Sequence, residues 1–285
     1  MTRKYLVVVR AGPKSLHPRL LRENPSRDWD CCVNWWAAPL EGLGAEYYVT
    51  GGDTKFEGLE MFLASQKAEL PYRYILAVDD DVYFRPGDLS RLFARCDQAG
   101  LYLAQPALRW SSFFSHVVLL RNAACALRKV TFVEVMAPCF SAAALKALRH
   151  TFTLNKSTYA IDWAWTAECL GEHDLHVVDE IGMLHTKPID RGRGAFYMMM
   201  RSRGIDPDAD AKKVFAMYPD VEFRAATCRE GHVFRGGIPR LAAPAIMRTV
   251  ERVKALAEAA QFLRVKWRGG LRKLRALFEG SAERR

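Results

Sequence analysis

Short apolar runs alternate with segments of helical periodicity along the first half of the chain. Apolar, β-branched runs bounded by polar residues are typical of buried strands, and apolar residues three to four apart are typical of helices. Strands that alternate with helices indicate an α/β fold with a mainly parallel sheet. The predicted strands are residues 6–9, 31–34, 47–49 and 74–78, and the predicted helices are residues 56–66 and a segment from Pro86 to about residue 98.

A second block of elements follows, and it extends the same domain. Residues 132–140 are predicted to form a strand, and Ser141 is predicted to cap a helix that ends near residue 150. A helix over residues 161–170 and a short strand over residues 175–178 complete the block. We expect residues 1–240 to form one catalytic-type domain.

The segment 241–285 differs from the rest of the chain in its charge and in its pattern of apolar residues. Its apolar residues fall on one helical stripe, and from residue 244 onward it has 11 Lys or Arg residues against four Glu residues. Two interpretations stay open: a basic amphipathic helix on an anionic membrane surface, or a helix that packs its apolar stripe on the catalytic domain.

Composition and charge narrow the class of protein. The 285 residues include 42 Lys or Arg and 32 Asp or Glu, a formal net charge of +10, which favours anionic partners. Nucleic acid is the least favoured of these because no recognition motif accompanies the charge. No apolar run has the length of a signal-peptide core or a membrane span, so we expect a cytoplasmic protein, or one peripheral on the inner face of the cell membrane. The seven cysteines are interpreted as reduced core residues.

Three consecutive carboxylates, Asp79-Asp80-Asp81, follow the clearest predicted strand. In open α/β sheets, ligands bind outside the carboxyl ends of the strands. Adjacent carboxylates repel one another unless a cation neutralises them. Asp79 and Asp81 lie on the same side of an extended segment, where they can share a hard divalent cation that bridges nucleotide phosphates. The alternative is a solvated acidic turn.

The segment Tyr72–Asp81 resembles the strand and Asp-x-Asp motif of glycosyltransferases with the A-type nucleotide-sugar fold. The segments 103–108 and 132–141, with Asp162-Trp163 and His185, are similar to a family of plant and bacterial domains of unknown function in that superfamily. Here Ile161-Asp162-Trp163 stands where that family has a glycine-rich stretch. The resemblance covers roughly Tyr5 to Arg193 and implies the A-type, Rossmann-like fold, to which the apolar stripe of the tail adds a C-terminal helical segment.

The resemblance also implies a metal site and a nucleotide-sugar site. Mn²⁺ or Mg²⁺ would be held by Asp79, Asp81 and His185. The basic residues after His185 suit a loop over a diphosphate, and a glycine-rich turn before a helix suits an anion. The expected nucleotide-sugar contacts are Arg10, Gly51, Gly52, Lys55, Asp80, Lys187, Arg191 and Arg193.

An inverting transfer needs a base for the acceptor hydroxyl. Asp162, beside Trp163 and Trp165, is the first candidate, and Glu134 is the second. Their alternative roles are a helix cap for Asp162 and an ion-paired strand residue for Glu134.

These features predict a metal-dependent glycosyltransferase of the hexosyltransferase type. It would move a sugar from a nucleoside-diphosphate donor to a hydroxyl of a glycan or lipid-linked acceptor. Two other functions stay open: a metal-dependent nucleotidyltransferase, and a catalytically silent membrane-surface binding protein with the same fold.

Overall fold

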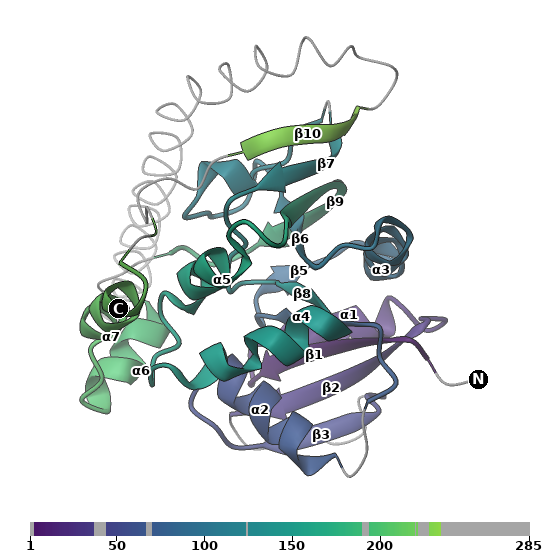
Figure 1. The fold of residues 1–285 in the computed structure, drawn as a ribbon. Helices are drawn as coiled ribbons and strands as arrows, with labels where there is room; N and C mark the ends of the chain where they lie inside the picture. The colour runs from purple at the N-terminus through teal and green to yellow at the C-terminus, as the bar shows by residue number, and fades with distance from the viewer. Residues whose placement is uncertain are drawn as a thin grey trace, which may run out of the picture. The chain divides into compact units, whose positions relative to one another are not determined.

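The fold is built on a ten-stranded mixed β-sheet. The computed structural model describes residues 3–36, 44–66, 70–123, 125–189, 194–219, 221 and 228–234. The strands are β1 (Tyr5–Ala11), β2 (Trp29–Trp35), β3 (Tyr47–Thr50), β4 (Tyr74–Val78), β5 (Val82–Tyr83), β6 (Leu103–Leu108), β7 (Cys125–Val130), β8 (Cys139–Ser141), β9 (Leu175–His185) and β10 (Cys228–Phe234). Nine of them lie in the order β10-β7-β9-β6-β8-β4-β1-β2-β3, and β5 pairs with β9 off this path (Figure 1).

The four strands β4, β1, β2 and β3 form a parallel unit, as the alternation of elements predicts. β4 is buried along its whole length, and β1 is buried except for Arg10. Such continuous burial is typical of a central parallel strand. Because parallel strands end at the same edge, the residues that follow β1, β2, β3 and β4 lie together.

The other half of the sheet is more antiparallel than expected. β8 pairs antiparallel with both β4 and β6, and β7 pairs antiparallel with β9 and β10. β6 and β9 are parallel neighbours in this half. The fold is therefore α/β with a mixed sheet.

Seven α-helices and two 3-10 helices accompany the sheet in the described ranges. They are α1 (His17–Arg22), α2 (Lys55–Ser65), α3 (Asp88–Ala99), η1 (Val117–Leu119), α4 (Ala142–Leu148), η2 (Arg149–Thr153), α5 (Ile161–Cys169), α6 (Ala195–Ser202) and α7 (Pro207–Met217). α2 packs against β1, β2, β3 and β4, and α3 packs against β4 and β9.

The strand predicted over residues 132–140 is wrong, because only Cys139–Ser141 is a strand. Much of the preceding backbone bonds to side chains instead of to a neighbouring strand. The Glu134 N–H donates to Gln105 Oε1 at 2.6 Å, and the Met136 carbonyl accepts from Lys55 Nζ at 3.1 Å. These bonds hold the segment as a loop against the end of β4.

All described residues belong to the first of two compact units, Met1–Ile238. The second unit, Pro239–Arg285, lies outside the described residues, so the domain boundary and the basic helical tail stay predictions. Within the described part of the chain, no helix has the length and apolar character needed to cross a membrane. Six of the seven cysteines are buried, in keeping with their predicted place in the core.

Candidate functional site

The three aspartates lie directly after β4, at the edge where the parallel strands end. The loop is fixed by its own backbone: Asp79 N–H donates to the Met136 carbonyl at 3.0 Å, and the Asp80 carbonyl accepts from Leu16 N–H at 2.7 Å. The Asp81 carbonyl accepts from both the N–H and the hydroxyl of Thr186. The carboxylates are therefore displayed on a turn with little freedom.

Asp79 is paired with Lys55, the first residue of α2. Lys55 Nζ lies 2.7 Å from Asp79 Oδ1, and the Lys55 side chain is buried. Burial raises the pKa of Asp79, while the Lys55 ammonium opposes that rise and the neighbouring Asp81 adds to it. The sequence prediction that Lys55 contacts a phosphate differs from this arrangement, in which Lys55 neutralises a carboxylate.

Lys55 reaches Asp79 because α2 starts where it does. Thr54 caps the helix, its side chain accepting from Glu57 N–H while the Glu57 side chain accepts from Thr54 N–H. This capping box satisfies two N–H groups that the helix leaves unpaired. It therefore fixes the position of Lys55 in the first turn.

Asp81 and His185 face each other, as the resemblance implies. His185 Nε2 lies 3.5 Å from Asp81 Oδ1. The pairing of β5 with β9, with Val82 opposite His185, brings them together. His185 lies at the end of an 11-residue strand, which is longer than the predicted strand over residues 175–178.

The imidazole of His185 is oriented by a backbone carbonyl. Its Nδ1 lies 3.0 Å from the Phe113 carbonyl oxygen, so Nδ1 carries the proton and Nε2 faces Asp81. Burial alone would lower the pKa of His185, but the Asp81 carboxylate raises it overall. The pKa of Asp81 is lowered, because its bonds to His185 and the charge of Lys187 outweigh burial.

Lys187 bridges the carboxylates of Asp80 and Asp81. Its ammonium nitrogen lies 3.3 Å from Asp80 Oδ1 and 3.4 Å from Asp81 Oδ2, and its side chain is half exposed. Burial raises the pKa of Asp80, and Lys187 opposes that rise. Arg191 and Arg193, predicted on the same loop, lie outside the described residues.

Two more carboxyl groups are buried near this cluster. Burial, and then the nearby Asp162, raise the pKa of Glu134 to about 7, and the charges of His185 and Asp79 also act on it. Burial raises the pKa of Asp162 to about 7. Both oxygens of Asp162 accept backbone bonds, from Val135 N–H at 3.3 Å and Trp163 N–H at 3.1 Å. In contrast, Glu134 Oε2 is buried without a hydrogen-bond partner among the described residues.

Arg10 lies at the end of β1 and braces the turn after β3. Its guanidinium donates to the carbonyls of Gly51 at 3.0 Å and Gly52 at 2.6 Å. Both glycines have positive φ angles, 107° and 72°, so the turn depends on them. Burial lowers the pKa of Arg10, although Glu57 and Asp53 favour its charge.

Trp36 lies at the same edge of the sheet, and the sequence prediction did not name it. It follows β2, is 54% exposed, and its ring covers Gly12, where an added Cβ would lie 2.3 Å from the ring. The signal was present in the pair Trp35-Trp36 at a strand end, since Trp35 is buried and Trp36 is not. An exposed aromatic face at this edge of the sheet suits stacking on a planar or sugar ring.

Among the residues described, no three His, Cys, Asp or Glu side chains form a ready metal shell. Asp79 is held by Lys55, which leaves Asp81 and His185 as the close pair. Such a pair is still a chemically suitable set, because Mg²⁺ is commonly held by one or two carboxylates together with substrate phosphates. The hydrogen bond from His185 Nδ1 to a carbonyl is also the usual arrangement behind a metal-binding imidazole.

No protein-family model and no curated protein matches the sequence. Solved structures with a similar fold include GalNAc-T7 with UDP, GalNAc and Mn²⁺, at 9% identity and a TM-score of 0.47 over 78% of this chain and 55% of that one. They also include S. aureus TarS residues 1–349 with UDP-GlcNAc, at 11% identity and a TM-score of 0.45 over 75% and 71%. Because both scores are below 0.5, the proposal that follows rests on the residues of the site.

Proposed function

We propose that the chain is a metal-dependent glycosyltransferase that takes a sugar from a nucleoside diphosphate and places it on a hydroxyl of a glycan or lipid-linked acceptor. The single observation that carries this is the strand-end cluster, in which Asp81 faces His185 beside the buried carboxyl of Glu134. Carboxylates and an imidazole at the carboxyl ends of parallel strands suit a cation that carries phosphates.

Asp81 and His185 are the residues that would hold Mn²⁺ or Mg²⁺. A divalent cation there supplies charge that stabilises the leaving diphosphate. The Phe113 carbonyl keeps the His185 ring turned so that Nε2 stays on the side of Asp81. Asp79, predicted as a ligand, is assigned a supporting role here because Lys55 holds its carboxylate.

Lys187 and the turn at Gly51 and Gly52 are the proposed contacts to the nucleotide. Lys187 is half exposed and makes only long bonds to Asp80 and Asp81, so it can turn to a phosphate when one arrives. Arg10 shapes the glycine turn through two carbonyls. The exposed ring of Trp36 offers a stacking surface at the same edge.

Glu134 is proposed as the base of an inverting reaction, in place of Asp162. Both Asp162 oxygens are used by backbone N–H groups, whereas Glu134 Oε2 has no partner among the described residues. The proton of the acceptor hydroxyl passes to that oxygen as the acceptor oxygen bonds to the anomeric carbon. The bond from the anomeric carbon to the phosphate oxygen breaks, and the nucleoside diphosphate leaves with the electron pair.

The test is product analysis with the full chain. The protein is incubated with MnCl₂ and each of a panel of uridine and guanosine diphosphate sugars, and nucleotide products are separated by chromatography. We expect release of a nucleoside diphosphate that is lost in Asp81→Asn and kept in Asp174→Asn, a change to a carboxylate that pairs with Lys129 at the surface. Release of inorganic diphosphate would instead indicate a nucleotidyltransferase. Absence of turnover with every donor would contradict the proposal.

A further inference from the structure

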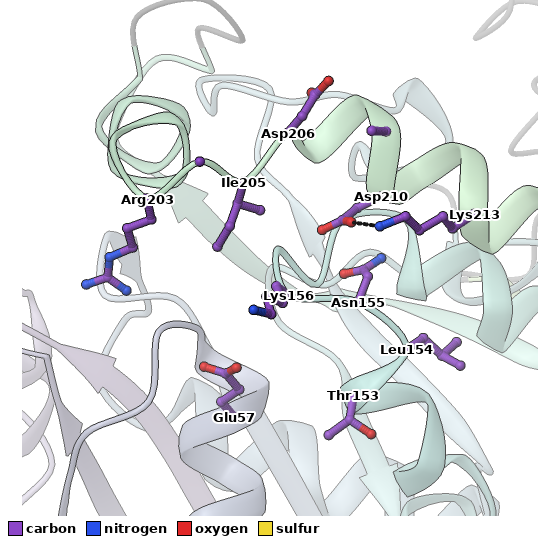
Figure 2. Close-up of a pocket in the computed structure, with 12 residues that line it drawn as sticks. Glu57, Thr153, Leu154, Asn155, Lys156, Arg203, Ile205, Asp206, Asp210 and Lys213 are labelled. Atoms are coloured by element: carbon purple, nitrogen blue, oxygen red, sulfur yellow. Dashed lines mark hydrogen bonds and ion pairs between the residues drawn. The ribbon is translucent and has the colours of Figure 1, made fainter.

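A cavity with both polar and apolar walls lies beside the first turn of α2 and has no role in the function proposed so far. Its volume is about 580 Å³. Its walls come from the first turn of α2, the end of η2 with the segment after it, the connection from α6 into α7, and α7 itself. Figure 2 draws Glu57, Lys156 and Arg203 around this space, each from a different element.

One wall of the cavity lies against the glycine turn. Glu57, which lines the cavity, packs on Gly52, where an added Cβ would lie 3.2 Å from Glu57 Cβ. Arg203, on the opposite wall, forms an ion pair with Asp53, which follows the glycine turn that Arg10 braces. A molecule in the cavity would therefore lie next to the turn that we assign to the nucleotide.

The acidic side chains of the cavity already accept hydrogen bonds from protein groups. Glu57 accepts from the backbone at the start of α2, and Asp206 Oδ1 accepts from Asp208 N–H at 3.0 Å, capping α7. Asp210 accepts from Ser157 N–H at 3.1 Å and from Lys213 Nζ at 3.1 Å. Each carboxylate is bound to groups of its own wall.

Not all of the cationic side chains of the cavity have such partners among the described residues. Arg203 is paired with Asp53, and Lys213 with Asp210. Lys156 lines the cavity and has no hydrogen-bond or ion-pair partner among the residues that the structure describes. The Lys156 side chain is exposed, so its ammonium can donate charge-assisted hydrogen bonds to an oxyanion that enters the cavity.

Lys156 is mounted on a rigid loop. The Asn155 amide donates to the Tyr159 carbonyl at 2.9 Å, and Ser157 is fully buried and bonded to Asp210. Thr158 and Ala160 have φ angles of 54° and 68°, which residues other than glycine rarely adopt. Such conformations persist where the surrounding structure enforces them, often at ligand sites.

We infer that this cavity binds the acceptor through an anionic group, a phosphate or carboxylate of a hydroxyl-bearing molecule such as a sugar phosphate or sugar acid, with Lys156 as the main contact. The inference rests on the proposed function, because it assigns the acceptor of that reaction. It gives a role to the unpaired ammonium of Lys156, which lines the cavity together with three carboxylates that are already hydrogen-bonded. Lys156 lies on the loop that leads into α5 and Asp162.

The test is direct binding by calorimetry to the full chain, without donor. The probes are glucose 6-phosphate, glucuronate and glucose, for the phosphate, the carboxylate and the neutral case. We expect one or both anions to bind, glucose to bind at least tenfold more weakly, and Lys156→Ala to weaken anion binding at least tenfold. The matched control is Lys212→Ala, an exposed lysine of α7 outside the cavity, which should change binding less than twofold.

A second measurement separates this inference from the proposed function. Binding of uridine and guanosine diphosphates with MnCl₂ is measured in the wild type and in Lys156→Ala. We expect Lys156→Ala to leave it unchanged while anion binding is lost. Equal anion binding in Lys156→Ala and the wild type, or no anion binding by the wild type, would overturn the inference. If the wild type binds neither nucleoside diphosphate, that result would contradict the proposed function instead.

Discussion

The ammonium nitrogen of Lys55 lies 2.7 Å from Oδ1 of Asp79 and donates as well to the carbonyls of Val135 and Met136. One side chain thus connects the first turn of α2, the end of β4 and the loop before β8. The lysine is buried, and its three acceptors leave it no spare donor for a ligand.

Replacing this lysine by a group without charge should lower stability. Lys55→Met leaves the Asp79 carboxylate and the Val135 carbonyl without the donor that Lys55 supplies, and breaking a buried pair costs about 3–5 kcal/mol. Because Asp79 is 40% exposed, we expect a smaller loss of about 1–3 kcal/mol in urea unfolding. Lys146→Met, at an exposed position of α4, is the control and should change the unfolding free energy by less than about 0.5 kcal/mol. An unchanged stability in Lys55→Met would show that the pair is not formed.

Removing either proposed metal-binding residue should affect turnover through the metal. Since losing an interaction that stabilises the leaving group reduces the rate, we expect Asp81→Asn to lower kcat at least about 100-fold. His185→Ala should weaken the apparent affinity for Mn²⁺ by about 10–100-fold, with partial recovery at high MnCl₂. Steady-state kinetics over a MnCl₂ titration, with chelator as the zero point, measures both. Full activity in chelator would contradict metal dependence.

Glu134→Gln should separate activity from stability. The folded protein holds a proton on Glu134 up to about pH 7, whereas the unfolded chain releases it near its ordinary value of 4.5. The folded state therefore binds more protons between those values, so the unfolding free energy falls as pH rises through this window. An amide side chain cannot ionise, and in chelator at pH 8 the variant should be about 1–3 kcal/mol more stable than the wild type. At pH 4 this advantage should disappear.

The same variant should lose transferase activity by about 100-fold or more, as expected for a general base. Asp162→Asn should be less active mainly through instability, since both of its oxygens serve the backbone. Comparing kcat with the unfolding free energy for the two variants distinguishes the roles. A larger loss of kcat in a well-folded Asp162→Asn than in Glu134→Gln would reverse the assignment.

Arg128 and Asp179 form a buried ion pair that lies far from the carboxylate cluster in the sequence. We expect changes to this pair to affect the stability of the protein and not its activity. Arg128 donates to both oxygens of Asp179 and to the carbonyls of Val118 and Leu120. Arg128→Met should cost about 3–5 kcal/mol, because it leaves Asp179 buried and charged. Arg128→Met with Asp179→Leu should recover part of that loss. The check is urea unfolding of both variants, and equal stability of the single variant and the wild type would contradict it.

The parallel half of the sheet was predictable because β1, β2, β3 and β4 carry strong local signals. Each is a short apolar or β-branched run, and the acidic cluster at the end of β4 follows from the rule for open sheets. The meeting of Asp81 with His185 was anticipated only through the resemblance, because the two residues are far apart in the sequence. Their contact depends on the pairing of β5 with β9, and a two-residue strand gives no pattern to detect.

Other parts of the site depend on tertiary contacts that no local pattern encodes. Residues 132–140 have strand composition, yet the side chains of Lys55, Gln105 and Asp162 bond the backbone of that segment and hold it as a loop. Lys55 was expected at a phosphate because it follows a glycine turn, and the nearby carboxylate and carbonyls decide otherwise. Lys156 gave no signal at all, since its neighbours in the cavity come from distant segments.

The left-handed backbone at Thr158 and Ala160 has a consequence for how this protein can diversify. The loop holds Lys156 at one end and runs into α5, with Asp162, at the other, so its length and conformation are constrained by both. The side chain at position 156, in contrast, is exposed and makes no contact that the fold needs within the described residues. With the cavity in the role we infer, a change at position 156 would alter which anion binds there, while Asp162 keeps its bonds to the backbone.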